Sequence, residues 1–303
     1  MLGVGIVGLP NSGKSTLFNA LLRKHIAQVG EYPYTTIEPN VGVVEVSDKR
    51  LEKISKVTKI EKIVPAAIKF IDIAGLIRGA HKGEGLGNQF LAKIREVDVI
   101  VHVVRAFENT NVEHTQGKID PMVDIDVISD ELKEASIEKS TICLINISEK
   151  DFKDSSLVQT IELIRKEVGV QVLPVCAKLE SEISEFSDEE QKQYFKELGI
   201  KESGLDQVVK AAYKLLDLIT FFTIVGAKQL QAWPIKRGKT AVEAAEVVHS
   251  DFAKGFIIAE VVDYPKLVDS GSWHAAKEKG LVKTVGKDGI IEDGQVVEFK
   301  FTQ

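Results

Sequence analysis

The sequence holds few residues of the kinds that mark secreted or membrane proteins. Only two cysteines, Cys143 and Cys176, occur in 303 residues, and both lie in apolar runs. We therefore expect buried free thiols rather than a disulfide framework or a cysteine metal site. No apolar run approaches the roughly 18 residues that a membrane-spanning helix needs. The apolar start MLGVGIVGLP lacks a basic lead and a cleavage-type site, which favours a first strand over a signal peptide. These absences predict a cytoplasmic protein with no membrane partner.

Basic residues are not in excess either. The chain has 39 Lys and Arg against 45 Asp and Glu, a formal net charge of −6. That balance argues against a protein that holds nucleic acid by bulk charge, so no DNA partner is expected, although a local basic face stays open. A hydrophobic content of 44% and a charged content of 28% are typical of a globular protein long enough for two domains.

Apolar, β-branched runs alternate with amphipathic helical patterns over the first two thirds of the chain. This alternation predicts an α/β domain whose parallel sheet carries helices on both faces. From about Leu218 the pattern changes to that of a small α+β module, with a closing hairpin expected in DGIIEDGQVVEFKF, residues 288–301. The predicted domains are residues 1–217 and 218–303.

Residues 8–15, GLPNSGKS, fit the phosphate-loop pattern GxxxxGK[ST] and stand between a predicted strand and a predicted helix. Glycines let backbone N–H groups turn toward phosphates, and the helix N-terminus adds its positive end. Lys14 supplies a charge to the β- and γ-phosphates, and the Ser15 hydroxyl ligates Mg²⁺. The predicted nucleotide-binding residues of this loop are Asn11, Ser12, Gly13, Lys14, Ser15 and Thr16.

A second acidic element supports the phosphate loop. In IKFIDIAG, Asp72 ends an apolar strand, where it can hold Mg²⁺ through water, and Gly75 can offer its N–H to the γ-phosphate. Thr36, in YPYTTIEPN, can complete the Mg²⁺ shell. The alternative is that the threonine is there only because threonine favours a β-strand. The predicted metal set is Ser15, Thr36 and Asp72, and Lys14, Thr36, Asp72 and Gly75 are predicted to serve catalysis.

The stretch LINISEKDF, residues 144–152, bears on which base is bound. Asn146 ends an apolar strand as a base-reading asparagine does, but Ile147 and Glu149 replace the Lys and Asp of a guanine-reading Asn-Lys-x-Asp loop. The longer Glu149 displaces the carboxylate that would accept two bonds from guanine, and losing such a charged contact abolishes guanine preference. We therefore predict binding of ATP in preference to GTP through Asn146, Ile147 and Glu149. The alternative is that Glu149 merely flanks a helix and another loop reads the base.

Together these motifs resemble the Obg-like ATPase (YchF) family. The resemblance rests on GIVGLPNSGKSTLFNAL, YTTIEPNVGVVEV, DIAGLIRGAHKGEGLGNQFLAKIREVD and HVVRAFEN, and it continues through LITFFT and EDGQVVEFKF. It implies a Ras-like P-loop NTPase domain, Mg²⁺, an ATP preference and a C-terminal β-grasp-like TGS domain. TGS domains are associated with RNA and ribosomes. In this sequence, KRGK (236–239) beside Trp233 is the direct support for RNA contact, and a Trp233 buried in a small core is the alternative.

Two features depart from related GTPases and from the family. Leu76 follows Gly75 where Ras-like enzymes carry a water-orienting glutamine, so another group must position water. The candidates are K⁺ held near Asn11, as the resemblance to potassium-dependent GTPases implies, His114, or a partner molecule. His114 could equally be a solvated loop residue. The family's coiled-coil arm is also absent, because SDELKEASIEKS (129–140) runs almost directly into TICLINIS.

The leading interpretation is therefore an Mg²⁺-dependent nucleotide hydrolase that prefers ATP and acts as a slow switch with the ribosome or translation machinery. A conventional Obg-type GTPase is the first alternative. A nucleotide-sensing module that binds RNA or ribosomes with negligible hydrolysis is the second, although Lys14, Ser15, Thr36 and Asp72 are all present.

Overall fold

The computed structural model describes residues 2–25, 40–73, 86–109, 114–115, 117–225 and 228–302. The chain divides into two compact units, each described by itself. Unit 1 comprises residues 1–44 and 68–216, and unit 2 comprises residues 45–67 and 217–303. Within the described ranges, no helix is both long and apolar enough to cross a membrane.

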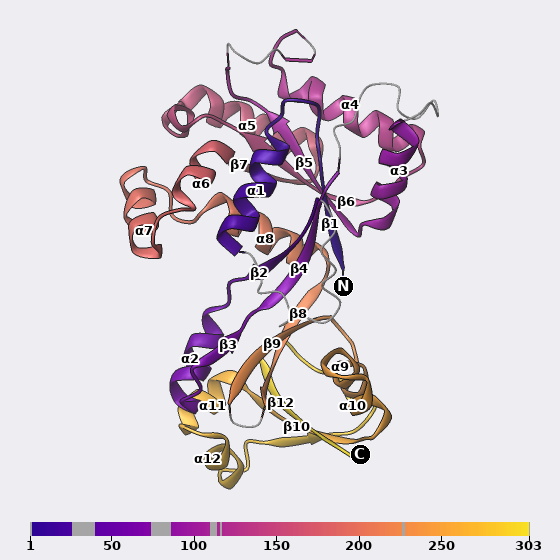
Figure 1. Ribbon diagram of the computed structural model, residues 1–303, viewed down its shortest axis with the longest axis vertical. Coiled ribbons are helices and arrows are strands. Elements are labelled where there is room, and N and C mark those ends of the chain that lie inside the picture. Colours follow the sequence, from indigo (N-terminus) through magenta and orange to yellow (C-terminus); the bar gives the residue numbers. More distant parts are fainter. Residues whose placement is uncertain are drawn as a thin grey trace. The chain divides into compact units, whose positions relative to one another are not determined.

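Unit 1 is built on a six-stranded sheet with the order β2-β4-β1-β5-β6-β7 (Figure 1). The four pairings from β4 through β1, β5 and β6 to β7 are all parallel. The strands are β1 Gly3–Val7, β2 Val41–Val46, β4 Ala66–Asp72, β5 Val99–Arg105, β6 Ser140–Asn146 and β7 Gln171–Val175.

Helices connect the parallel strands of unit 1. They are α1 Lys14–His25, α3 Leu86–Glu96, α4 Pro121–Glu134, α5 Ser155–Val168, α6 Ala177–Ile183, α7 Asp188–Glu197 and α8 Gly204–Leu215, with a 3-10 turn, η2, at Glu149–Lys153. Every residue of β5 is buried, so the centre of the sheet is covered on both faces. The α/β fold with a phosphate loop after β1, predicted from the alternating pattern, is confirmed.

Unit 2 carries a second six-stranded sheet, with the order β11-β10-β12-β8-β9-β3. Pairings β10–β11, β10–β12 and β8–β9 are antiparallel, whereas β12–β8 and β3–β9 are parallel. The strands are β3 Lys62–Val64, β8 Leu218–Val225, β9 Gln229–Lys236, β10 Phe256–Asp263, β11 Lys283–Val285 and β12 Gln295–Phe301. The helices are α2 Lys49–Thr58, α9 Ala241–Val248, α10 Ser250–Lys254, α11 Tyr264–Ser270 and α12 Trp273–Glu278.

The core of unit 2 includes an apolar cluster that contains Phe221, Trp233, Val261 and Phe299. The expected hairpin over residues 288–301 is wrong. Only β12 forms there, and it pairs with β10 and β8 instead of with a neighbouring strand of the same segment. Ile290 makes an isolated bridge to Thr240 because the chain turns back toward the start of α9.

The two units differ from the predicted domains 1–217 and 218–303 in one segment. Residues 45–67 belong to unit 2, although the prediction placed them in the first domain. Strand β3 pairs with β9, and helix α2 packs against α11 and β9. The Arg50 guanidinium fastens α2 in place: it bonds Asp48 and reaches Asp293 Oδ2 at 2.8 Å. It also lies over the ring of Phe222, with 5.2 Å to the centroid. Contacts with residues far along the chain therefore override the sequence position of this segment.

Candidate nucleotide site

The phosphate loop has the backbone that close approach to a ligand requires. Asn11 and Gly13 adopt positive φ angles of 64° and 90°, values that Asn tolerates and Gly adopts freely. A Cβ on Gly13 would lie 2.1 Å from Nδ2 of Asn146, so only glycine fits there. The buried hydroxyl of Ser12 has no hydrogen-bond partner within the described part of the chain. An inward-facing polar atom of this kind fits a phosphate oxygen.

Lys14, Ser15 and Asp72 converge at the carboxyl ends of β1 and β4. Lys14 Nζ lies 2.6 Å from Asp72 Oδ1, and the Ser15 hydroxyl donates to Asp72 Oδ2 at 3.0 Å. The Lys14 and Asp72 side chains are about nine-tenths buried. A hydroxyl and a carboxylate are the oxygen ligands that Mg²⁺ prefers, with phosphate oxygens and water completing its shell. These residues therefore fit a magnesium ion beside phosphates.

Asn146, at the end of β6, ties the phosphate loop to the loop after β7. Its side chain is 4% exposed, its Nδ2 donates to Ser12 O at 2.9 Å, and its Oδ1 accepts from Ala177 N at 3.0 Å. Three segments distant in sequence are thus held together by one amide. The sequence pointed to Asn146 as a base reader, but it carried no signal for this bridging role.

Ile147 and Glu149 face different surroundings. Ile147 is 3% exposed and packs in a core cluster with Ile145, Cys176 and Leu179, so its side chain serves the core. Glu149 is exposed at the start of η2, and its Oε1 accepts a hydrogen bond from the Tyr194 hydroxyl at 3.3 Å. The nearby Glu149 carboxylate, together with burial, raises the pKa of Tyr194. Tyr194 was missed, because nothing local links a tyrosine on α7 to this loop.

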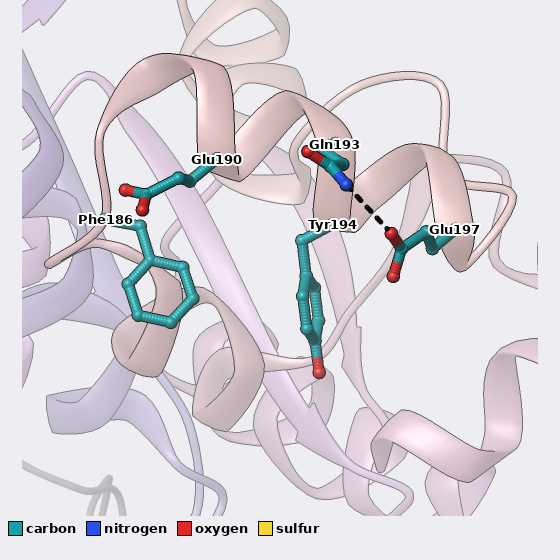
Figure 2. A pocket seen from close by; sticks show the side chains of 5 residues that line it. All are labelled: Phe186, Glu190, Gln193, Tyr194 and Glu197. Carbon is teal, nitrogen blue, oxygen red and sulfur yellow. Dashed lines mark hydrogen bonds between the residues drawn. The ribbon is translucent and has the colours of Figure 1, made fainter.

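A shallow pocket of about 200 Å³ lies along α7, lined by Phe186, Glu190, Gln193, Tyr194 and Glu197. In Figure 2 the Phe186 ring comes from the segment just before α7 and the Tyr194 ring from α7 itself, and a dashed line marks the bond from Gln193 to Glu197, which is 3.3 Å long. No residue of the phosphate loop lines it. Its connection to the candidate site is the bond between Tyr194 and Glu149.

His114 is buried against helix α4, so the solvated-loop interpretation is wrong. Its Nε2 lies 3.0 Å from Asp124 Oδ2, and the two side chains are 6% and 2% exposed. Burial raises the pKa of Asp124, and the bond to His114 opposes that rise. Asp124 Oδ1 has no partner among the described residues. Sequence reasoning missed Asp124, although its place four residues before the buried Ile128 puts it on the buried face of α4.

The remaining predicted residues are placed as follows. Asn11, Ser15 and Thr16 are exposed in the phosphate loop and first turn of α1. Thr36, Gly75 and Leu76 lie outside the described residues. Cys143 and Cys176 are free and buried, as expected, and burial raises the pKa of Cys143 to about 12.

Comparison with known proteins identifies the family. Residues 3–147 match the family "50S ribosome-binding GTPase", and residues 218–302 match "YchF-GTPase_C", a protein of unknown function (DUF933). A ribosome-binding ATPase YchF of Haemophilus influenzae is 42% identical, with 98% of each chain covered. The Bacillus subtilis protein of the same name is also 42% identical, over 99% of each chain. The chain belongs to the YchF family.

The solved structure of the Schizosaccharomyces pombe YchF GTPase supports the same assignment. Its TM-score is 0.85 at 30% identity, and the match covers 99% of this chain and 97% of the yeast chain. The alignment with the Haemophilus YchF protein runs over 358 residues, more than the 303 of this chain, so that relative carries residues with no counterpart here. The family resemblance seen in the motifs is thereby confirmed.

Proposed function

We propose that this chain is an Mg²⁺-dependent nucleotide hydrolase that prefers ATP and acts with the ribosome in the cytoplasm. The convergence of Lys14, Ser15 and Asp72 carries the proposal. The backbone of the phosphate loop and Lys14 would hold the phosphates, and Ser15 and Asp72, with Thr36, would hold Mg²⁺. When bound, Mg²⁺ neutralises negative charge on the phosphates. YchF relatives are named ribosome-binding ATPases.

Base selection is assigned to Asn146 and Glu149. The fixed Asn146 amide presents the same edge to either purine, so discrimination depends on the carboxylate of Glu149. A conventional GTPase stays the alternative, since the matched N-terminal family and the yeast relative are both named GTPases.

Water positioning is assigned to His114, and K⁺ near Asn11 is assigned to charge neutralisation. Because His114 is held by Asp124, this role requires the imidazole to leave that contact. We expect His114→Ala to lower turnover at least tenfold with little change in ATP affinity. Equal turnover would remove His114 from the catalytic residues, and replacing K⁺ by Na⁺ tests the potassium assignment separately.

Competitive binding of ATP and GTP, with Mg²⁺ and K⁺ present, tests base selection. ATP should bind more tightly, and Glu149→Asp should shift the ratio toward GTP. Ile147 is left unchanged, because a lysine at that buried position would disturb the core. A clear GTP preference in the unchanged protein would overturn the ATP assignment, and co-sedimentation with purified ribosomes tests the partner.

A further inference from the structure

The basic cluster that the sequence offered for RNA contact is largely neutralised in unit 2. Arg237 lies 3.3 Å from Asp217, and Lys239 lies 2.5 Å from Glu243. Trp233 is 7% exposed, and its Nε1 donates to Thr223 Oγ1 at 2.8 Å. The aromatic ring is therefore part of the core and offers no surface on which an RNA base could stack.

Helix α2 carries a different basic surface. Lys49, Lys53 and Lys56 follow one another at i, i+4 and i+7, so they share one side of the helix, and all three are exposed. Lys59, also exposed, follows at the C-cap. Within the described ranges none of these four ammonium groups has a carboxylate at ion-pair distance. We call Lys49, Lys53, Lys56 and Lys59 the α2 lysine face.

The α2 lysine face is held on a well-defined helix. Asp48 caps the N-terminus by accepting from Arg50 N, and Lys59, at φ 58°, closes the C-terminus through its N–H to Ser55 O. Leu51 and Ile54 bury the opposite side. The four lysines therefore extend over about 15 Å of helix axis in a fixed arrangement, which suits contact with two or three phosphates of one strand.

The surroundings favour RNA over a lipid bilayer. A helix that lies in a membrane interface buries an apolar face in it. The apolar side of α2 is already packed within unit 2, where the helix contacts α11 and β9 (Figure 1). No large apolar side chain of α2 is exposed. The helix has one acidic residue, Glu52, so the positive field is little offset locally. Unpaired lysines without an apolar anchor match the phosphate backbone of a folded RNA.

We propose that the α2 lysine face binds the phosphate backbone of RNA and is the surface through which this protein contacts ribosomal RNA. The inference rests on the proposed function for its partner, but it names the surface, which the family assignment does not. Lysine contacts with phosphate carry no sequence information, so binding is expected to depend on RNA charge and shape and little on base sequence.

The test compares two triple variants with the same change in charge. Lys49→Gln, Lys53→Gln and Lys56→Gln together remove most of the α2 lysine face. Lys192→Gln, Lys196→Gln and Lys201→Gln remove three exposed lysines of unit 1 that also lack a described ion-pair partner. Anisotropy of a labelled 20-base-pair RNA duplex is measured against KCl, together with co-sedimentation with ribosomes. Circular dichroism and ATP affinity confirm that each variant is folded.

The α2 triple should lower RNA affinity at least tenfold and reduce the slope of log affinity against log salt by about three, one for each lost contact. The matching Lys→Arg triple should restore binding, because arginine keeps the charge. If the α2 triple and the unit 1 triple lose RNA affinity equally, binding depends on the net charge of the protein and not on the α2 lysine face, and the proposal is overturned. Binding to vesicles that contain phosphatidylserine is measured in parallel. An α2 triple variant that loses vesicle binding but keeps RNA binding would also overturn the proposal. If the unchanged protein fails to sediment with ribosomes, the proposed function fails, whereas unaltered sedimentation of the α2 triple overturns this inference alone.

Discussion

The two sheets of this protein use polar residues in different ways. In unit 1, parallel strands bring Asp72 and Asn146 to the same edge, where Lys14 follows β1. In unit 2, the largely antiparallel sheet uses polar side chains for internal pairing, as in the bond from Trp233 to Thr223, and a group of exposed lysines without a described ion-pair partner lies on α2. In a parallel sheet the carboxyl ends of all strands lie at one edge, so the functional residues that follow the strands meet there. In an antiparallel sheet the carboxyl ends of neighbouring strands lie at opposite edges, so no such site forms. The candidate binding residues of unit 2 therefore lie on the surface of a helix.

Removing Lys14 should have the largest effect and be confined to unit 1. Lys14→Ala deletes the cation beside Asp72 and leaves that carboxylate facing phosphate. We expect nucleotide affinity to fall about tenfold to hundredfold, since charge-assisted hydrogen bonds contribute about 1.5–3 kcal/mol. Titration with a fluorescent ATP analogue measures the loss, and Lys254→Ala, an exposed lysine of unit 2, is the control. Unaltered affinity would remove Lys14 from the phosphate site.

Removing Arg50 should affect the other unit. Burial alone would lower the pKa of Arg50, but hydrogen bonds to Asp48 and Asp293 outweigh it and raise that pKa, so the guanidinium stays charged. Arg50→Met leaves two carboxylates without their cation, and we expect a loss of about 2 kcal/mol in the unfolding free energy of unit 2.

Urea unfolding followed by tryptophan fluorescence reads this loss, because both tryptophans, Trp233 and Trp273, lie in unit 2. The exposed pair of Arg237 with Asp217 supplies the control, since Arg237→Met should cost less than 1 kcal/mol. ATP affinity should stay the same in both variants. Equal unfolding free energies for the two variants would show that Arg50 does not fasten α2.

His102 should make the stability of unit 1 depend on pH. Burial lowers its pKa to about 3, so the folded protein keeps the ring neutral while the unfolded chain takes up a proton below about 6.5. The unfolded state then binds more protons, and stability is lost as the pH falls. Between pH 7.5 and 5.5 this loss should be about 1.4 kcal/mol.

The difference between the parent protein and His102→Leu isolates this contribution, because the other groups titrate in both. Urea unfolding followed by circular dichroism at several pH values measures it. His274→Leu removes an exposed histidine of unit 2 and is the matched control. Parallel pH profiles for the parent protein and the His102→Leu variant would show that His102 has the same pKa in the folded and unfolded states, which would contradict the prediction.

Tyr194 should have the smallest effect. Tyr194→Phe deletes only the hydroxyl that bonds Glu149, and a less fixed carboxylate discriminates less between bases. We expect the ratio of ATP to GTP affinity to narrow about twofold to threefold, which corresponds to roughly 0.5 kcal/mol. Competition titrations measure it, with Tyr264→Phe in unit 2 as the control. An unchanged ratio would separate α7 from base selection.

The site residues that could be predicted from the sequence are those that lie in contiguous motifs. Lys14, Ser15 and Asp72 meet as expected because a strand, a glycine-rich turn and a helix fix the phosphate loop locally, and the strand carrying Asp72 pairs beside it. The burial of His114 against Asp124 and the bond from Tyr194 to Glu149 join separate elements, so no local pattern announces them. The placement of residues 45–67 was missed for the same reason.

Residues 45–67 are synthesised long before the rest of unit 2, so this segment cannot complete its folding when it leaves the ribosome. Strand β3 is among the first elements to leave the ribosome, but its partner residues Gln229, Leu230 and Gln231 are synthesised about 170 residues later. At about 5–20 residues per second, the delay is on the order of ten to thirty seconds. During that interval Leu51 and Ile54 lack the surface on which they finally pack. The nascent chain therefore carries an incomplete part of unit 2, with apolar side chains still uncovered, while unit 1 is being completed.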